Sequence, residues 1–265
     1  MKFFRQKYPI SGTDIDPQYR LTPHAVLAFS QDSAARYMAQ HRMAAFDVIA
    51  DNLIWVISET GVEISDELPF WSEEIEIEVW VSEISALRLY VEFSICDDRR
   101  RNFACGHYIF SLLHRESRRL TPLGALASRI ERHEATALDS HKRPAFPAVT
   151  ESAGTTSHLI CFPDVDFNYH VGNRCYPAIA ERLMPVDYRE THTVRRYDIR
   201  FRSEAFLGER IVGEMFRTEQ PDHYAFRFTR ESDNALLCLI DSVWQPLSPR
   251  TIHDRRAAES PDEQR

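Results

Sequence analysis

The chain carries one sequence pattern twice, and this repetition limits what it can fold into. DIDPQYRLTPHAVLAF begins at Asp14 and DVDFNYHVGNRCYPAI begins at Asp164, with Asp, Asp, Tyr and Ala identical in register. Further along, FWSEEI (70–75) matches FLGERI (206–211). Such a repeat indicates two copies of one structural unit. If each unit is a helix packed on a sheet, the two sheets can join at their edges into one continuous sheet.

Strands are expected to dominate both copies, because apolar and polar residues alternate along them. In EIEIEVWVS (74–82), isoleucine and valine alternate with mostly acidic residues, as in a half-buried strand. The same pattern marks the other expected strands, which are 88–95, 103–115, 196–203, 209–218, 223–230 and 235–246.

Each copy also has one expected helix. In the first, Thr22 is expected as the N-cap and Pro23 suits the first helical position. In the second, Tyr176, Ile179 and Leu183 fall on one helical face. Helices packed on antiparallel strands predict an α+β fold.

Composition divides the chain into four parts. The first unit covers 1–139 and the second covers 158–247. Between them, 140–157 is rich in Pro, Ser, Thr and Ala and is expected to be a linker. The polar end, 248–265, is expected to be a disordered tail.

Charge and cysteine content exclude several classes of protein. The net charge of −8 argues against nucleic acid as a partner. No apolar run is long enough to span a membrane, and the first residues lack the apolar core of a signal peptide. The cysteines are unpatterned and odd in number, which is typical of reduced thiols in a cytoplasm.

The polar residues differ between the two copies. Asn168 and His170 stand where the first copy has Gln18 and Arg20, and Glu204 has a leucine as its counterpart. One active site in a duplicated fold would look like this. Random drift between two structural halves would look the same.

The motif DVDFNYHVGNRCY resembles the second-domain motif of the acyl-acyl carrier protein (acyl-ACP) thioesterases, approximately D-x-N-x-H-V-N-N followed by Tyr. DIDPQYRLTPHAVLAFSQDSA, LIWVISETGVEI and PFWSEEIEIEVWV resemble the first domain, so the likeness runs from about Phe4 to Pro246. The resemblance implies a double hotdog fold, with two helix-in-sheet units packed as an internal pseudo-dimer. It also implies hydrolysis of acyl-ACP, releasing a fatty or related acid without a cofactor.

The same resemblance implies the catalytic residues. Asp166, Asn168 and His170 match the family's Asp, Asn and His, and YDIRFRSEAFLGE places the catalytic carboxylate at Glu204. Ala205 stands where plant members carry a cysteine once proposed as nucleophile, which favours direct attack by water.

One departure from the motif lies at the helix start. The family's paired asparagines are here Gly172 and Asn173, and glycine supplies no side-chain amide. The helix opening near Asn173 presents free backbone N–H groups, so this segment is the expected oxyanion site.

The chemistry of thioester hydrolysis suggests a role for each residue type. A thiol leaves readily because its pKa is about 8.5, so the main demands are a base and an oxyanion site. Glu204 is the preferred base, with its pKa expected to rise beside an apolar tunnel. His170 is the alternative base, Asn168 a donor to water or carbonyl, and Asp166 an orienting or capping residue.

The implied partner is an acidic carrier protein that holds the acyl chain on phosphopantetheine. A chain of net charge −8 needs a local basic patch to bind it. Residues that could line the acyl tunnel are Val26, Phe29, Trp55 and Ile57. Residues that could form a basic patch are Arg99 to Arg101, Arg115, Arg118, Arg119, Arg195, Arg196, Arg200 and Arg202.

Other functions remain open from the sequence. A non-catalytic acyl-binding module is one, because Gly172 breaks the motif, and a thioesterase for acyl-CoA or a polyketide carrier is another. A dehydratase ranks low, because no H-x-x-x-G-x-P signature is present. No metal site is expected, because the spacing of His107, His114, His133 and His141 offers none. The chain is expected to act as a monomer or homodimer.

Overall fold

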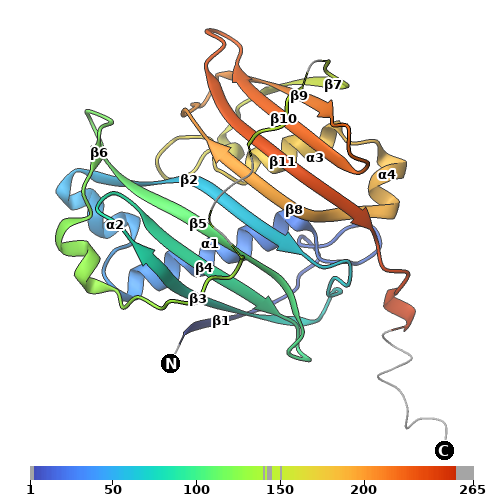
Figure 1. Ribbon diagram of the computed structural model, residues 1–265, viewed down its shortest axis with the longest axis horizontal. Coiled ribbons are helices and arrows are strands. Elements are labelled where there is room, and N and C mark those ends of the chain that lie inside the picture. Colours follow the sequence, from blue (N-terminus) through green and yellow to red (C-terminus); the bar gives the residue numbers. More distant parts are fainter. Residues whose placement is uncertain (1–2, 140, 142–144, 150, 255–265) are drawn as a thin grey trace, which may run out of the picture.

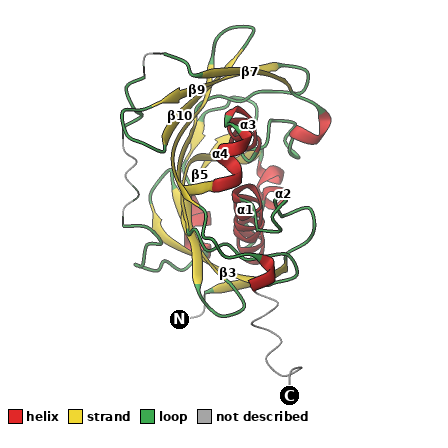
Figure 2. Cartoon of the chain, turned by 90° about the vertical axis from the view of Figure 1, so that its right-hand side faces the viewer, coloured by secondary structure: helices red, strands yellow, loops and turns green. Residues whose placement is uncertain are grey.

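The fold is a single antiparallel sheet with helices on one face, as seen in the computed structural model (Figures 1 and 2). The structure describes residues 3–139, 141, 145–149 and 151–254. The sheet has 11 strands in the order β1-β3-β4-β5-β2-β8-β11-β10-β9-β7, and β6 pairs with β5. The α+β class and the two helix-in-sheet units expected from the sequence are thereby confirmed.

The first unit contributes one half of the sheet and its longest helix. Its helices are α1 (Pro23–Gln40), α2 (Ala45–Val48) and the short 3-10 segments η1 (Ile49–Asp51) and η2 (Gly124–Arg129). Its strands are β1 (Phe4–Pro9), β2 (Leu53–Ile64), β3 (Glu74–Ile84), β4 (Leu89–Cys96), β5 (Asn102–His114) and β6 (Leu120–Thr121).

The second unit repeats this plan with a shorter helix. Its helices are η3 (Phe162–Asp164), α3 (Cys175–Leu183) and α4 (Val186–Thr191). Its strands are β7 (Gly154–Leu159), β8 (His192–Phe201), β9 (Arg210–Arg217), β10 (His223–Arg230) and β11 (Leu236–Pro246).

The two units join where β2 pairs antiparallel with β8. The register runs from Glu59 opposite Arg200 to Glu63 opposite Arg196. Because β2 also pairs with β5, and β8 with β11, hydrogen bonds continue across the seam. This is the edge-to-edge joining that the sequence repeat indicated.

The helix α1 forms where the capping residues predict. Thr22 accepts a hydrogen bond from the Ala25 amide at 3.1 Å, and Pro23 occupies the first turn. The helix is fixed to the sheet by a buried hydrogen bond between the hydroxyls of Ser30 and Tyr108, 2.7 Å apart. Apolar residues of β3 that alternate in sequence, such as Val79, are fully buried beneath it.

The repeated Asp-x-x-Tyr motif forms the same turn in both units. Asp16 accepts hydrogen bonds from the amides of residues 18 and 20 at 2.8 and 2.9 Å. Asp166 accepts from those of residues 168 and 170 at 2.8 and 3.4 Å. Tyr19 and Tyr169 both adopt a positive φ, 65° and 63°. The repeat is therefore structural as well as sequential.

Four strands were not among those expected from alternation, and one of them, β6, has only two residues. β1 and β7 are edge strands whose sequences, FRQKYP and GTTSHL, lack an apolar period, and β2 mixes exposures along its length. The first strand of the second unit begins at Gly154, within the segment 140–157 expected as linker. Residues 140, 142–144 and 150 of that segment lie outside the described part of the chain.

The segment expected to be a disordered tail, 248–265, falls into two parts. The carbonyl oxygens of Ser248 and Arg250 accept hydrogen bonds from Arg20 at 3.1 and 3.0 Å, so its first residues pack on the first unit. Residues 255–265, where disorder was also expected, lie outside the described residues. Among the helices that the structure describes, none is long and apolar enough to cross a membrane.

Candidate active site

The site is a cavity of about 350 Å³ between the two units. One wall is the face of α1 that carries Ala28, Ala35 and Met38, together with β2 and β5. The other wall belongs to the second unit and runs through residues 166–174, Tyr176 and the segment after β8.

Glu204 lies in the loop that follows β8. Its carbonyl oxygen accepts a hydrogen bond from Arg230 at 2.5 Å, and the next residue, Ala205, is buried and accepts from the Val171 amide at 2.9 Å. These backbone contacts hold the loop against the strand-like segment that carries His170. The carboxylate of Glu204 is thereby placed on the cavity wall.

His170 and Glu204 meet directly. His170 Nδ1 lies 3.0 Å from Glu204 Oε1, and the two side chains are 14% and 29% exposed. The turn and the loop meet in both units. His170 forms an antiparallel β-bridge with Phe206 in the second unit, as Arg20 does with Phe70 in the first. The same turn therefore faces the same loop in both units.

Arg118 is a third member of this group, and it comes from the other unit. It sits with a φ of 55° in the hairpin between β5 and β6. One of its terminal nitrogens lies 2.6 Å from Glu204 Oε2 and 2.7 Å from His170 Nε2. The sequence suggested Arg118 only as part of a surface patch, because nothing local shows that this hairpin reaches the second unit.

These contacts fix the proton on His170. A guanidinium can only donate, so Nε2 must accept from Arg118. Nδ1 is then the ring nitrogen that carries a proton toward Glu204, whose Oε1 lies 3.0 Å away. The Nε2 lone pair is occupied by the contact with Arg118 in this arrangement.

The charge state of Glu204 follows from the same contacts. Burial raises its pKa and is the largest effect, but the hydrogen bond from His170 and the guanidinium of Arg118 together outweigh it. The pKa is lowered from the ordinary glutamate value. The expectation of a raised pKa is therefore wrong, because the sequence did not show the two donors. Glu204 is ionised at neutral pH.

Asp166 and Asn168 occupy the turn before His170. The carboxylate of Asp166 is exposed and bonds the backbone amides of the turn, as Asp16 does in the unit without a histidine. Asp166 therefore shapes the turn in this structure. Asn168 lines the cavity together with Glu204 and His170.

The start of α3 differs from that of α1 because Gly172 replaces the capping threonine. Its amide donates to the Asp164 carbonyl at 2.9 Å, and the helix begins only at Cys175, without a side-chain cap. The amides of Asn173 and Arg174 have no acceptor among the described residues. Both residues line the cavity.

The four residues expected to line an acyl tunnel lie in two environments. Trp55 and Ile57 line the cavity. Val26 is fully buried in the core, and Phe29 packs on Tyr8 with ring centroids 4.8 Å apart. In an amphipathic helix, sequence alone does not separate the residues that face a cavity from those that face the sheet.

The cysteines take no visible part in the site. All five are free thiols. Cys175 lies between the cavity-lining residues Arg174 and Tyr176 in sequence, and burial raises its pKa to about 11. A thiol in that state is a weak nucleophile at neutral pH.

Most of the basic clusters suggested by the sequence are paired within the chain. Arg101 contacts Asp97 and Glu67, each at 2.7 Å, and Arg196 contacts Asp198 at 2.8 Å. By contrast, Arg115 and Arg119 are exposed on the hairpin that carries Arg118.

Comparison with known proteins agrees with this geometry. The family model for the acyl-ACP thioesterase N-terminal domain matches residues 1–124, and that for the C-terminal domain matches residues 150–246. No curated protein sequence gives a significant match.

Solved structures of the same fold cover almost the whole chain. An acyl-ACP thioesterase from Bacteroides thetaiotaomicron is 17% identical with a TM-score of 0.80, covering 91% of this chain and 97% of that one. A 12:0-ACP thioesterase from Umbellularia californica is 16% identical with a TM-score of 0.81, covering 92% and 97%. At these identities the likeness shows the fold, which is the double hotdog.

Proposed function

The chain belongs to the acyl-ACP thioesterase family and hydrolyses the thioester of acyl-ACP, and we propose that Glu204 activates the attacking water. The observation that carries this proposal is the contact of Glu204 with His170 and Arg118 on the cavity wall. Each carboxylate oxygen has a second lone pair, so Glu204 can accept a proton from water while both donors stay in place.

The reaction forms a C–O bond, breaks the C–S bond and transfers one proton from water to the departing sulfur by way of Glu204. Water oxygen attacks the thioester carbon while Glu204 takes a proton from the water. The tetrahedral intermediate collapses by breaking the C–S bond, and the departing sulfur receives the proton from Glu204. The products are a free acid and the carrier's thiol. The lowered pKa of Glu204 favours this return of the proton.

The developing oxyanion is stabilised by donors at the start of α3. The free amides of Asn173 and Arg174 and the side chain of Asn168 line the same cavity as Glu204. Backbone N–H groups at a helix start need no reorganisation during the reaction. Gly172 has no side chain to donate, and its own amide is bonded to the Asp164 carbonyl. The role therefore falls to the backbone amides that follow it.

The hairpin of Arg118 is the proposed docking point for the carrier. Its exposed Arg115 and Arg119 flank a residue of the site, so a carrier bound there would hold its phosphopantetheine arm near Glu204. Local positive charge suits an acidic partner although the chain carries −8 overall. Nucleic acid and membranes have no part in this proposal, which places the enzyme in the cytoplasm.

One chain supplies every group in this mechanism. We therefore propose that a monomer is competent and that a homodimer would carry two independent sites.

Hydrolysis of a panel of acyl-ACP substrates, differing in length and oxidation state, tests the function. Release of free carrier thiol at a rate that saturates with substrate is expected. Tight acyl-ACP binding without thiol release would instead support an acyl-binding module. A higher kcat/KM for acyl-CoA, or for acyl chains on a polyketide carrier, would identify that thioester as the substrate. The mechanism of hydrolysis would be the same.

Replacing Arg118 tests its effect on the base. In Arg118→Ala, loss of the guanidinium removes one cause of the lowered pKa, so the pKa of Glu204 rises. Because the base must be ionised, kcat/KM falls as pH drops through that pKa, and this acid limb moves to higher pH in the variant. We expect a rate loss of about tenfold at neutral pH, less than the roughly 10²- to 10⁴-fold range for complete loss of a general base.

Arg118→Lys is the matched control for charge. It keeps the positive charge, so its acid limb lies between those of the wild type and Arg118→Ala. An acid limb near 6.5 in the wild type, the ordinary value for an imidazole, would contradict a carboxylate base.

Narrowing the cavity is expected to shorten the preferred acyl chain. Ala35 lines the cavity from an exposed position of α1, so Ala35→Leu adds bulk with little effect on stability. Excluding two methylenes costs about 1.6 kcal/mol of binding, or roughly a 15-fold lower kcat/KM for the longest accepted chain. A competition assay with mixed chain lengths measures this ratio. Ala39→Leu, on the same helix but not on the cavity wall, should leave the ratio unchanged.

A further inference from the structure

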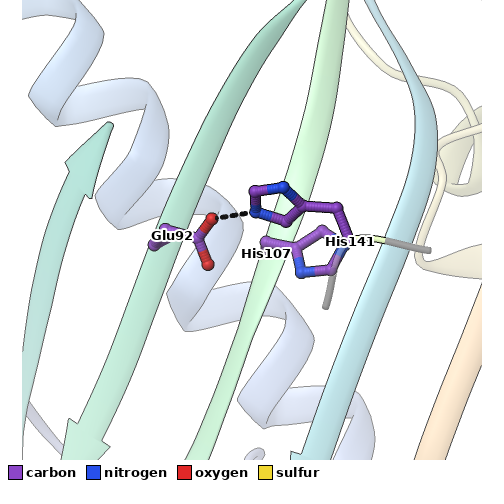
Figure 3. A group of neighbouring side chains, drawn as sticks. All are labelled: Glu92, His107 and His141. Atoms are coloured by element: carbon purple, nitrogen blue, oxygen red, sulfur yellow. Dashed lines mark hydrogen bonds and ion pairs between the residues drawn. The ribbon is translucent and has the colours of Figure 1, made fainter. Parts of the chain in front are cut away.

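A second group of chemically active side chains lies on the other face of the sheet. Glu92, His107 and His141 converge there, with α1 behind the strands (Figure 3). One ligand atom from each residue lies within 4.8 Å of the others. The acyl cavity opens on the helix side, so this group takes no part in the proposed reaction.

Two members are held rigidly by the sheet. Glu92 on β4 and His107 on β5 are register partners in the antiparallel pair, and both are fully buried. The third, His141, belongs to the segment that leaves the first unit, and its side chain is 17% exposed. Spacing along the sequence gave no sign of this group, because a cross-strand pair and a distant loop residue supply it.

The carboxylate of Glu92 is well supported. It accepts hydrogen bonds from the Ser82 hydroxyl at 2.5 Å and from the Ala137 amide at 3.0 Å. His141 Nε2 lies 2.6 Å from Glu92 Oε1 and 3.4 Å from the Ser82 hydroxyl. The other ring nitrogen, Nδ1, lies 3.8 Å from Glu83. In this arrangement Nε2 carries the proton that faces Glu92, and a metal ion bound at Nε2 would displace that proton while the Glu83 carboxylate accepts from Nδ1.

We propose that Glu92, His107 and His141 bind a divalent transition-metal ion, with Zn²⁺ the best match. Two imidazole nitrogens and a carboxylate oxygen form a ligand set that Zn²⁺ uses in proteins, with water in the remaining position. Ligand bonds of about 2.0–2.2 Å require ligand atoms roughly 3.4 Å apart. Small side-chain rotations bring the three atoms from their present separations to that distance.

The ion would secure the start of the segment that connects the two units. This segment already lies on the outer face, where the His133 amide donates to the Val81 carbonyl at 2.8 Å and Trp80 donates to the Ala135 carbonyl at 2.7 Å. A metal bond to His141 would extend this attachment by one further point. Its expected effect is on stability, and turnover does not require it.

Metal titration of the full-length protein tests the site. After chelator treatment and dialysis, the wild type should bind one more Zn²⁺ than His141→Gln or Glu92→Gln, as measured by calorimetry and elemental analysis. Co²⁺ should give visible d–d absorption that both variants lose. At free Zn²⁺ about 100 times Kd, the melting temperature should rise by roughly 5 °C or more in the wild type alone.

His133→Gln is the matched control, because His133 is a buried histidine on the same face but outside the group. It should keep the full stoichiometry and the Co²⁺ spectrum. In Glu92→Gln the amide oxygen can still accept from the Ala137 amide and the NH2 group can donate to the Ser82 hydroxyl, so the variant should fold. Equal Zn²⁺ stoichiometry and affinity in the wild type and His141→Gln would overturn the proposal, whatever the outcome of the hydrolysis assays.

Discussion

Glu204→Gln is expected to lower kcat for acyl-ACP hydrolysis by about 10²- to 10⁴-fold, the range for loss of a general base. Glutamine has nearly the same shape, and its carbonyl oxygen can still accept from His170 Nδ1. It cannot take a proton from water. Because the acyl chain binds elsewhere in the cavity, KM should change little, and stopped-time measurement of carrier thiol release gives both constants.

Glu209→Gln is a close control for this experiment. Glu209 lies on the same turn, accepts from the Phe206 amide at 2.9 Å and contacts Arg230 at 3.2 Å, but it does not line the cavity. Its variant should retain most of the activity. A Glu204→Gln enzyme with at least a tenth of wild-type kcat would show that another group activates the water.

His170→Ala is expected to lower kcat by about 10²-fold through misplacement of the base. The change removes the Nδ1 donor to Glu204 and the Nε2 acceptor for Arg118, so Arg118 is left to pair with the carboxylate alone. A tighter pair with Arg118 turns Glu204 away from water. Steady-state kinetics and the pH profile measure the loss together.

His170→Asn separates positioning from proton transfer. An asparagine amide can donate from nearly the position of Nδ1, so this variant should recover much of the activity lost in His170→Ala. His158→Ala serves as the control, because His158 also pairs with a carboxylate, Asp164 at 2.9 Å, outside the cavity. If His170→Asn is as inactive as His170→Ala, the imidazole itself transfers the proton.

The parts of the fold that depend on local chemistry were predictable from the sequence. The cap of α1 at Thr22, the seven alternating strands and the turn shaped by Asp16 and Asp166 each follow from short-range rules. The repeat indicated the two-unit plan, and the family resemblance pointed to Glu204 and His170 as partners. The structure shows that the turn and the loop that carry them pair in the same way in both units.

What the sequence missed depends on contacts between the units. Arg118 enters the site because its hairpin crosses to the second unit, and no residue near it in sequence reports this. The direction of the pKa shift at Glu204 was predicted wrongly for the same reason. Its burial could be foreseen from the sequence, but its contacts with His170 and Arg118 could not. Edge strands such as β7 were missed because one unpaired side relaxes the need for an apolar period.

The pairing of β2 with β8 has a mechanical consequence. Unlike two lobes on a flexible tether, the halves of this molecule cannot swing apart without breaking a ladder of main-chain bonds in the middle of the sheet. Admission of a long acyl tail and escape of the freed acid must therefore rely on local yielding of side chains and short loops at the rim. The frame itself stays closed throughout a turnover.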